Sequence, residues 1–209
     1  MFYSEFKRRR LQTLARDVSG HNKITLRFGG NPRTDFGIIE VVDFTETQEI
    51  CPGVPCTEAE AWVAMKASVC HEAAHLRFTD QKVWETAAKD PRLACIVNSL
   101  EDLRIERAIS ERFSGAARWI SWYNHYFCNE YRKVINNNPP AVRFLITLMF
   151  AVLYGEIFPI SEQHLVKQYL DLAARARMAA TTEELLGYAE EILRDPEVQN
   201  LFPAQIELP

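Results

Sequence analysis

The sequence predicts an α+β fold that is predominantly α-helical, with a small N-terminal β-sheet or hairpin and a helical body. Two observations predict it: β-branched and alternating segments are confined to residues 24–43, and helix-start signals recur from residue 57 onward. Strands and helices are therefore segregated along the chain. The 209 residues, 47% of them hydrophobic, suffice to bury one sizeable core. We therefore expect a single domain over residues 1–209.

The N-terminal part, residues 1–50, is expected to hold one helix and the strands. Residues 4–18 place apolar side chains among basic ones at helical spacing. The segment 24–28 alternates in polarity, residues 29–32 (Gly-Gly-Asn-Pro) mark a turn, and residues 37–43 are rich in β-branched side chains. Two strands joined by a loop follow from this pattern, and a hairpin is the simplest pairing.

The helical body is expected over residues 57–195, because helix-start signals recur there. Thr57 and Glu60 are expected to form a capping box, in which the threonine hydroxyl and the glutamate carboxylate each accept a hydrogen bond from the other residue's backbone N–H. Asp90 before Pro91 combines an N-cap with a proline at the first helical position. Further starts are predicted at Asn138-Pro139-Pro140, Ser161 and Thr181–Glu184, and Gly115 is expected to end the helix that begins at Pro91.

Composition and charge exclude several classes of protein. A formal net charge of −4 makes nucleic acid an unlikely partner, and we interpret the short basic run Lys7–Arg10 as a solvated helix face. The sequence has no stretch of about 18 apolar residues, so no membrane span is predicted. No secretory signal is recognisable, and five cysteines are an odd number. We therefore expect a cytoplasmic protein with free thiols and no membrane partner.

The most informative motif is His71-Glu72-Ala73-Ala74-His75, an H-E-x-x-H run inside the helix that Thr57 begins. Histidines at i and i+4 lie on one helix face, so both imidazoles can bind one metal ion. The adjacent Glu72 can then act as general base toward a water on that metal. Small residues on the histidine side, Ala64 and Ser68, leave room for an ion and a substrate. Histidines with ordinary hydrogen bonds remain the alternative.

A catalytic zinc site usually has three protein ligands, so a third is expected from another helix. The segment 98–106 (Asn-Ser-Leu-Glu-Asp-Leu-Arg-Ile-Glu) offers it. Glu101 is the first choice, because it projects into a less polar surround where an acid needs a partner, and Asp102 is the second. Asp102 or Glu106 could instead accept a hydrogen bond from a metal-binding histidine and so orient its ring. The alternative is an acidic helix surface paired to Arg104 and Arg107.

These two segments resemble those of a known family. The run HEAAH followed by a helix with a glutamate resembles the gluzincin clan of zinc metallopeptidases, which implies a zincin-like fold with that glutamate, here Glu101, as third ligand. Residues 71–79 and 98–106 are more narrowly similar to the metallopeptidase-like region of cobaltochelatase-subunit-T-like proteins. The resemblance covers about residues 57–112. The von Willebrand factor A domain of those proteins and its D-x-S-x-S motif have no counterpart in this sequence.

Peptide hydrolysis also needs a group that stabilises the oxyanion. The predicted helix over residues 119–134 is rich in candidates, of which His125 and Tyr123 are the choices. An amphipathic, partly buried aromatic helix explains the same residues without any catalytic role.

The sequence as a whole predicts a Zn²⁺-dependent metallopeptidase that acts on a peptide or protein substrate, with Glu72 as general base. A non-catalytic module of a larger complex, with a protein partner, is the alternative. A nucleic-acid-associated peptidase is a third option that rests only on the basic run near the N-terminus.

Overall fold

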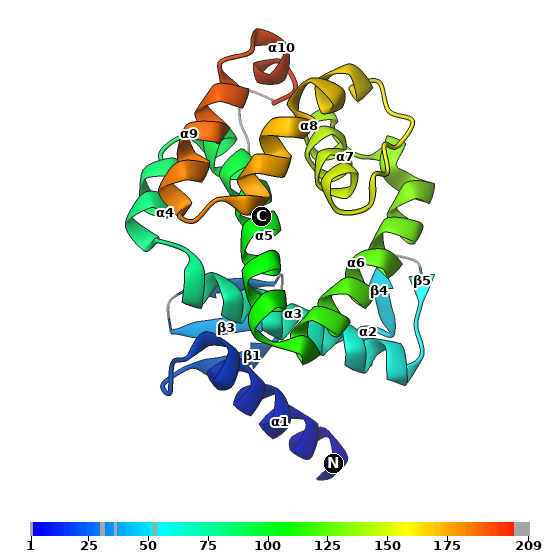
Figure 1. The fold of residues 1–209 in the computed structure, drawn as a ribbon. Coiled ribbons are helices and arrows are strands. Elements are labelled where there is room, and N and C mark those ends of the chain that lie inside the picture. The colour runs from blue at the N-terminus through cyan, green and yellow to red at the C-terminus, as the bar shows by residue number, and fades with distance from the viewer. Residues whose placement is uncertain (1, 30–31, 36, 52–53, 203–209) are drawn as a thin grey trace. The chain divides into compact units, whose positions relative to one another are not determined.

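The structure is a computed structural model that describes residues 2–29, 32–35, 37–51 and 54–202 (Figure 1). Most of these residues are helical, and the strands all lie before residue 56. The prediction of a predominantly helical α+β fold is confirmed. The chain divides into two compact units, Met1–Phe78 with Ala108–Glu130 and Thr79–Arg107 with Tyr131–Pro209. The single domain over residues 1–209 stays a prediction.

The elements follow one another in a simple order. The strands are β1 (Thr25–Phe28), β2 (Arg33–Asp35), β3 (Ile38–Val41), β4 (Glu49–Cys51) and β5 (Val54–Pro55). The helices are α1 (Phe2–Ser19), α2 (Phe44–Thr47), α3 (Glu58–Phe78), α4 (Gln81–Ala87), α5 (Pro91–Arg112), α6 (Ser114–Val134), α7 (Pro140–Tyr154), α8 (Gln163–Met178), α9 (Thr182–Leu193) and α10 (Pro196–Gln199), with a 3₁₀ turn at Ile135–Asn137.

The N-terminal sheet has three strands in the order β1-β3-β2. The predicted hairpin of the strands at residues 24–28 and 37–43 is wrong, because β1 and β3 are parallel. Strand β1 pairs with β3 in parallel, with Leu26 opposite Ile39. Strand β2 follows the turn predicted at residues 29–32 and lies in the stretch expected to be a loop between the two strands; it pairs antiparallel with β3 and places Thr34 opposite the same Ile39. In this central strand, Ile39 and Val41 are two residues apart, so they share one face of the sheet, and both are fully buried.

In the unit that contains the sheet, α3 is the central element. Helix α1 packs along α3, and β2 and β3 contact it as well. The apolar side of α1, with Leu11, Ala15 and Val18, is buried. Helix α1 ends at Gly20, whose φ of 78° favours glycine, and the Arg77 guanidinium of α3 donates a 2.7 Å hydrogen bond to the Val18 carbonyl. A cation at the C-terminus of a helix is favourable, so α1 and α3 are joined at this end.

The basic run of α1 is largely neutralised by acidic neighbours. Lys7 pairs with Glu58 at 2.6 Å, Arg9 pairs with Glu5 at 2.7 Å, and Arg8 contacts Asp43 at 3.4 Å and Glu46 at 3.5 Å. Three of the four basic side chains of the run, Lys7, Arg8 and Arg9, thus have an acidic partner within the chain.

The predicted helix starts at Thr57, Asp90 and Thr181 are confirmed, whereas α8 begins at Gln163 with Glu162, and not Ser161, as its N-cap. The Glu60 carboxylate accepts a 2.8 Å bond from the Thr57 N–H, and the Thr57 hydroxyl accepts from the Glu60 N–H at 3.3 Å. Asp90 precedes α5, and Thr181 caps α9. The prediction that Gly115 ends a helix is wrong, because α5 ends at Arg112 and Gly115 lies in the first turn of α6.

The other unit is helical. Helix α7 packs against α8, and α9 contacts α4, α8 and α10. Its buried apolar side chains include Phe144, Leu148, Phe158, Leu165 and Ile192. Helix α7 ends at Gly155, whose φ of 70° is left-handed. Among the described residues, no helix is long and apolar enough to cross a membrane.

Candidate metal centre

Helix α3 brings the two histidines of the H-E-x-x-H run onto one face. His71 and His75 are one turn apart, with ring centroids 5.0 Å apart and the rings nearly perpendicular at 77°. Both side chains are half-buried, whereas Ala73 and Ala74 between them are fully buried. The helix therefore exposes the two imidazoles together, because its other faces are used in packing.

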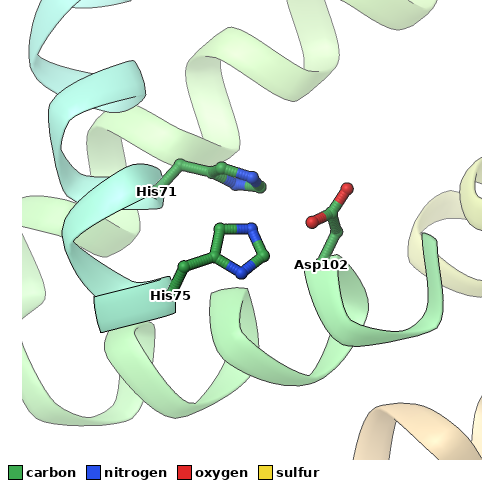
Figure 2. A group of neighbouring side chains, drawn as sticks. All are labelled: His71, His75 and Asp102. Carbon is green, nitrogen blue, oxygen red and sulfur yellow. The ribbon is translucent and has the colours of Figure 1, made fainter. Parts of the chain in front are cut away.

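Helix α5 supplies a carboxylate to the same group. Figure 2 shows the carboxylate of Asp102 directed toward the two imidazole rings. His71, His75 and Asp102 each offer one ligand atom, and the three atoms lie within 4.8 Å of one another. A zinc ion with bonds of about 2.0–2.2 Å holds tetrahedral ligand atoms about 3.5 Å apart. The widest separation in the group therefore exceeds that spacing by at most about 1.3 Å.

The donor set fits a divalent cation of intermediate hardness. Two imidazoles and one carboxylate are a ligand set found in catalytic zinc sites, where the fourth position remains available for water. Asp102 is half-buried. Its Oδ2 accepts a 3.5 Å hydrogen bond from the Asn98 amide, whereas its buried Oδ1 accepts no hydrogen bond. The three residues therefore have the donor chemistry that zinc requires and lie close enough together to be candidate ligands of one ion.

Glu101, the first choice for the third ligand, is used elsewhere. Its side chain is 1% exposed, and both of its oxygens accept 2.7 Å hydrogen bonds from Arg104, Oε2 from Nε and Oε1 from Nη2. Its Oε1 also accepts a 3.1 Å bond from the hydroxyl of Thr182. Asp102 therefore replaces Glu101 as the candidate third ligand. The buried Glu101 carboxylate has a partner, as expected, but that partner is Arg104 rather than a metal ligand set.

Thr182 is a residue that sequence reasoning missed. It is 2% exposed, and its hydroxyl accepts a 2.9 Å hydrogen bond from the Asp80 N–H as well as donating to Glu101. Its local sequence signals only a helix start, because Thr181 beside it is the N-cap of α9. No pattern along the chain links a residue to a carboxylate 81 positions away.

The remaining predicted residues have the following places. Glu72 is 6% exposed on α3, next to His71, and Glu106 is 9% exposed on α5. Tyr123 on α6 has aromatic neighbours, with ring centroids 6.4 Å from Phe44 and 6.2 Å from Phe127. His125 is exposed. Neither Tyr123 nor His125 belongs to the group of three ligands, and the roles of Glu72, Tyr123 and His125 stay predictions.

Cys70 lies beside His71 but in different surroundings. Its thiol is fully buried, and burial raises its pKa to about 12, an effect that the nearby Lys66 ammonium partly offsets. A metal binds the thiolate rather than the thiol. Because consecutive helical residues point about 100° apart, Cys70 packs in the interior while His71 faces the candidate site.

The fold and the site define a helical α+β protein with a candidate centre of two histidines and one carboxylate. No protein-family model, curated protein or solved structure matches this chain. The resemblance to gluzincins therefore stays a prediction, and it is weakened at Glu101, where a glutamate ligand is expected and an ion pair is found.

Proposed function

We propose that this protein is a zinc-dependent hydrolase of peptide bonds, with His71, His75 and Asp102 as its metal ligands. One observation carries the proposal: the two histidines of an H-E-x-x-H run and a carboxylate from a second helix have ligand atoms within 4.8 Å of one another. The same motif supplies a glutamate, Glu72, in the position of a general base.

Zinc bound there would polarise the scissile carbonyl and lower the pKa of a water molecule. The protein's own residues would do the rest. Glu72 would take the proton of the attacking water and deliver it to the leaving amine. Its side chain is 6% exposed and lies next to His71 in the H-E-x-x-H run, largely out of bulk water. His125 and Tyr123 remain the proposed oxyanion-stabilising residues.

The proposed substrate is a peptide or protein, and the proposed location is the cytoplasm. The test begins with elemental metal content of the purified protein after equilibration with zinc, followed by hydrolysis of a denatured protein substrate such as casein. The Glu72→Gln variant should keep its zinc and lose hydrolysis by about 10²–10⁴-fold, because only the proton transfer is removed. The matched control is Glu58→Gln, a change at an exposed glutamate of the same helix, which should keep both.

Three results would contradict parts of the proposal. Protein that binds no zinc has no such centre. Zinc binding without any hydrolysis indicates the non-catalytic alternative, a module that works with a protein partner. Tight binding of Fe²⁺ in preference to zinc would indicate a different chemistry, since two histidines and one carboxylate also form non-haem iron sites.

A further inference from the structure

The inference concerns how α5 presents Asp102, and it rests on the proposed metal centre. Glu101 and Asp102 are consecutive, so their side chains point about 100° apart around the helix axis. An interaction that fixes the direction of Glu101 therefore fixes the direction of Asp102. A rotation of α5 by one residue would direct Glu101 toward the position that Asp102 now occupies.

Glu101 and Arg104 form a buried, two-pronged ion pair. The two hydrogen bonds are 2.7 Å each, and the side chains are 1% and 5% exposed. Such a pair tolerates little change of geometry, because both charges have lost their water and depend on each other. The pair therefore holds one face of α5 in a defined direction.

Thr182 and its neighbours connect this pair to other helices of the same unit. The Thr182 hydroxyl donates to Glu101 Oε1 at 3.1 Å and accepts from Arg104 Nη2 at 3.4 Å. It also accepts from the Asp80 N–H, at the start of α4, at 2.9 Å. Arg104 Nη1 donates to the Ala180 carbonyl at 3.4 Å, just before α9. We name Glu101, Arg104 and Thr182 the α5 clamp.

A further contact lies one turn along the same side of α5. The Arg107 Nε donates a 2.8 Å hydrogen bond to the carbonyl of Arg177 in the last turn of α8. Residues 101, 104 and 107 share this side because they are spaced by three. The contacts with α4, α8 and α9 thus lie along one stripe, and Asp102 lies on the adjacent one.

We propose that the α5 clamp is the positioning device of the metal centre: it sets the rotation of α5 so that Asp102, and not Glu101, presents its carboxylate to the histidines. Its members are positioning residues and do not bind the metal. Loss of a residue that orients a metal ligand typically reduces metal affinity 10- to 100-fold. The clamp should therefore influence zinc affinity from outside the ligand set.

The test measures zinc affinity of the full chain by competition with a chromophoric chelator. Thr182→Val keeps the shape of the side chain and removes its hydroxyl, and it should weaken zinc binding by about 10-fold. Thr182→Ser restores the hydroxyl and should restore the affinity. The matched control is Tyr169→Phe, which removes a 2.8 Å hydrogen bond to Asp195 in the same unit outside the clamp, and should leave zinc affinity unchanged.

A double variant, Glu101→Met with Arg104→Met, provides the second measurement, since it removes both buried charges together and leaves neither unpaired. It should fold and bind zinc more weakly than the unmodified protein. Unchanged zinc affinity in Thr182→Val, or in the folded double variant, would overturn the clamp while the metal centre stands. An unmodified protein that binds no zinc would overturn both proposals.

Discussion

Two adjacent carboxylates on α5, Glu101 and Asp102, have different surroundings and different partners. Glu101 is buried at 1% exposure and bound by Arg104 and Thr182. Asp102 is half-buried and lies with His71 and His75. The same contrast occurs on α3, where Cys70 is fully buried and His71 is half-buried. On each helix, one of two consecutive residues is buried in the interior and the other belongs to the candidate metal site.

The contrast shows why burial alone does not identify a metal ligand. A fully buried acid must be neutralised, and a protein can do so with its own cation. A ligand needs a position that water, metal and substrate can reach. A half-buried acid beside two histidines meets that condition better than a fully buried acid with a complete set of hydrogen bonds.

The largest effect on stability is expected when the buried ion pair of Glu101 and Arg104 is broken. Arg104→Met leaves the Glu101 charge buried without its partner and should lower the free energy of unfolding by about 3–5 kcal/mol. Urea unfolding followed by circular dichroism measures the change. Arg9→Met breaks an exposed pair with Glu5, whose side chains are 79% and 60% exposed, and should change stability by less than about 1 kcal/mol. Equal losses in the two variants would contradict the assigned role of the clamp.

Cys70 gives a prediction about pH. Its pKa of about 12 reduces its thiolate fraction at pH 8 by about three orders of magnitude relative to an ordinary thiol. Because burial raises the pKa of Cys70, its thiolate fraction becomes large only at a pH well above that at which an ordinary thiol ionises. Iodoacetamide pulses on the folded protein, followed by peptide mass spectrometry, should label the half-buried Cys56 first and Cys70 only on unfolding. Rapid labelling of Cys70 at pH 8 would show that it faces the site.

Zinc should stabilise the protein through Asp102. Free zinc at a hundred times its dissociation constant should raise the free energy of unfolding by about 2.7 kcal/mol, because only the folded chain holds the complete site. Urea unfolding with and without zinc measures this difference. Asp102→Asn should abolish it, whereas Asp171→Asn, at an exposed aspartate of α8, should preserve it. A stabilisation that survives in Asp102→Asn would mean that zinc binds elsewhere.

The smallest effect is expected at the capping box of α3. Thr57→Ala removes the hydroxyl that accepts from the Glu60 N–H and should cost about 1 kcal/mol of stability. His71 is 14 residues further on, about 21 Å along the helix axis, so zinc affinity should be unchanged. Chelator competition and urea unfolding on the same variant measure both quantities. A loss of zinc affinity as large as in Thr182→Val would remove the distinction between capping and positioning.

The sequence predicted the features that depend on neighbouring residues. The starts of α3, α5 and α9 follow from caps within a few positions, at Thr57, Asp90 and Thr181. The spacing of His71 and His75 also places them on one helix face without tertiary information. These predictions required only the geometry of a single helix.

The predictions that failed depended on distant parts of the chain. Strand β3 could pair with β1 in either direction; it pairs in parallel with β1 and antiparallel with β2, which lies at its other edge. The partners of Glu101 and Arg104 include Thr182 and Ala180, which belong to a segment far along the chain, and the choice between Glu101 and Asp102 as metal ligand stays a prediction. A helical projection gives the angle between two residues but not the identity of the partner that each one meets.

We propose Asp102, and not Glu101, as the third metal ligand. The most direct measurement is zinc stoichiometry by elemental analysis at saturating zinc, on the unmodified protein, Asp102→Asn and Glu101→Gln, each checked for folding by circular dichroism. We expect one zinc per chain in the unmodified protein and in Glu101→Gln, and none in Asp102→Asn. Zinc retained in Asp102→Asn and lost in a folded Glu101→Gln would contradict the account.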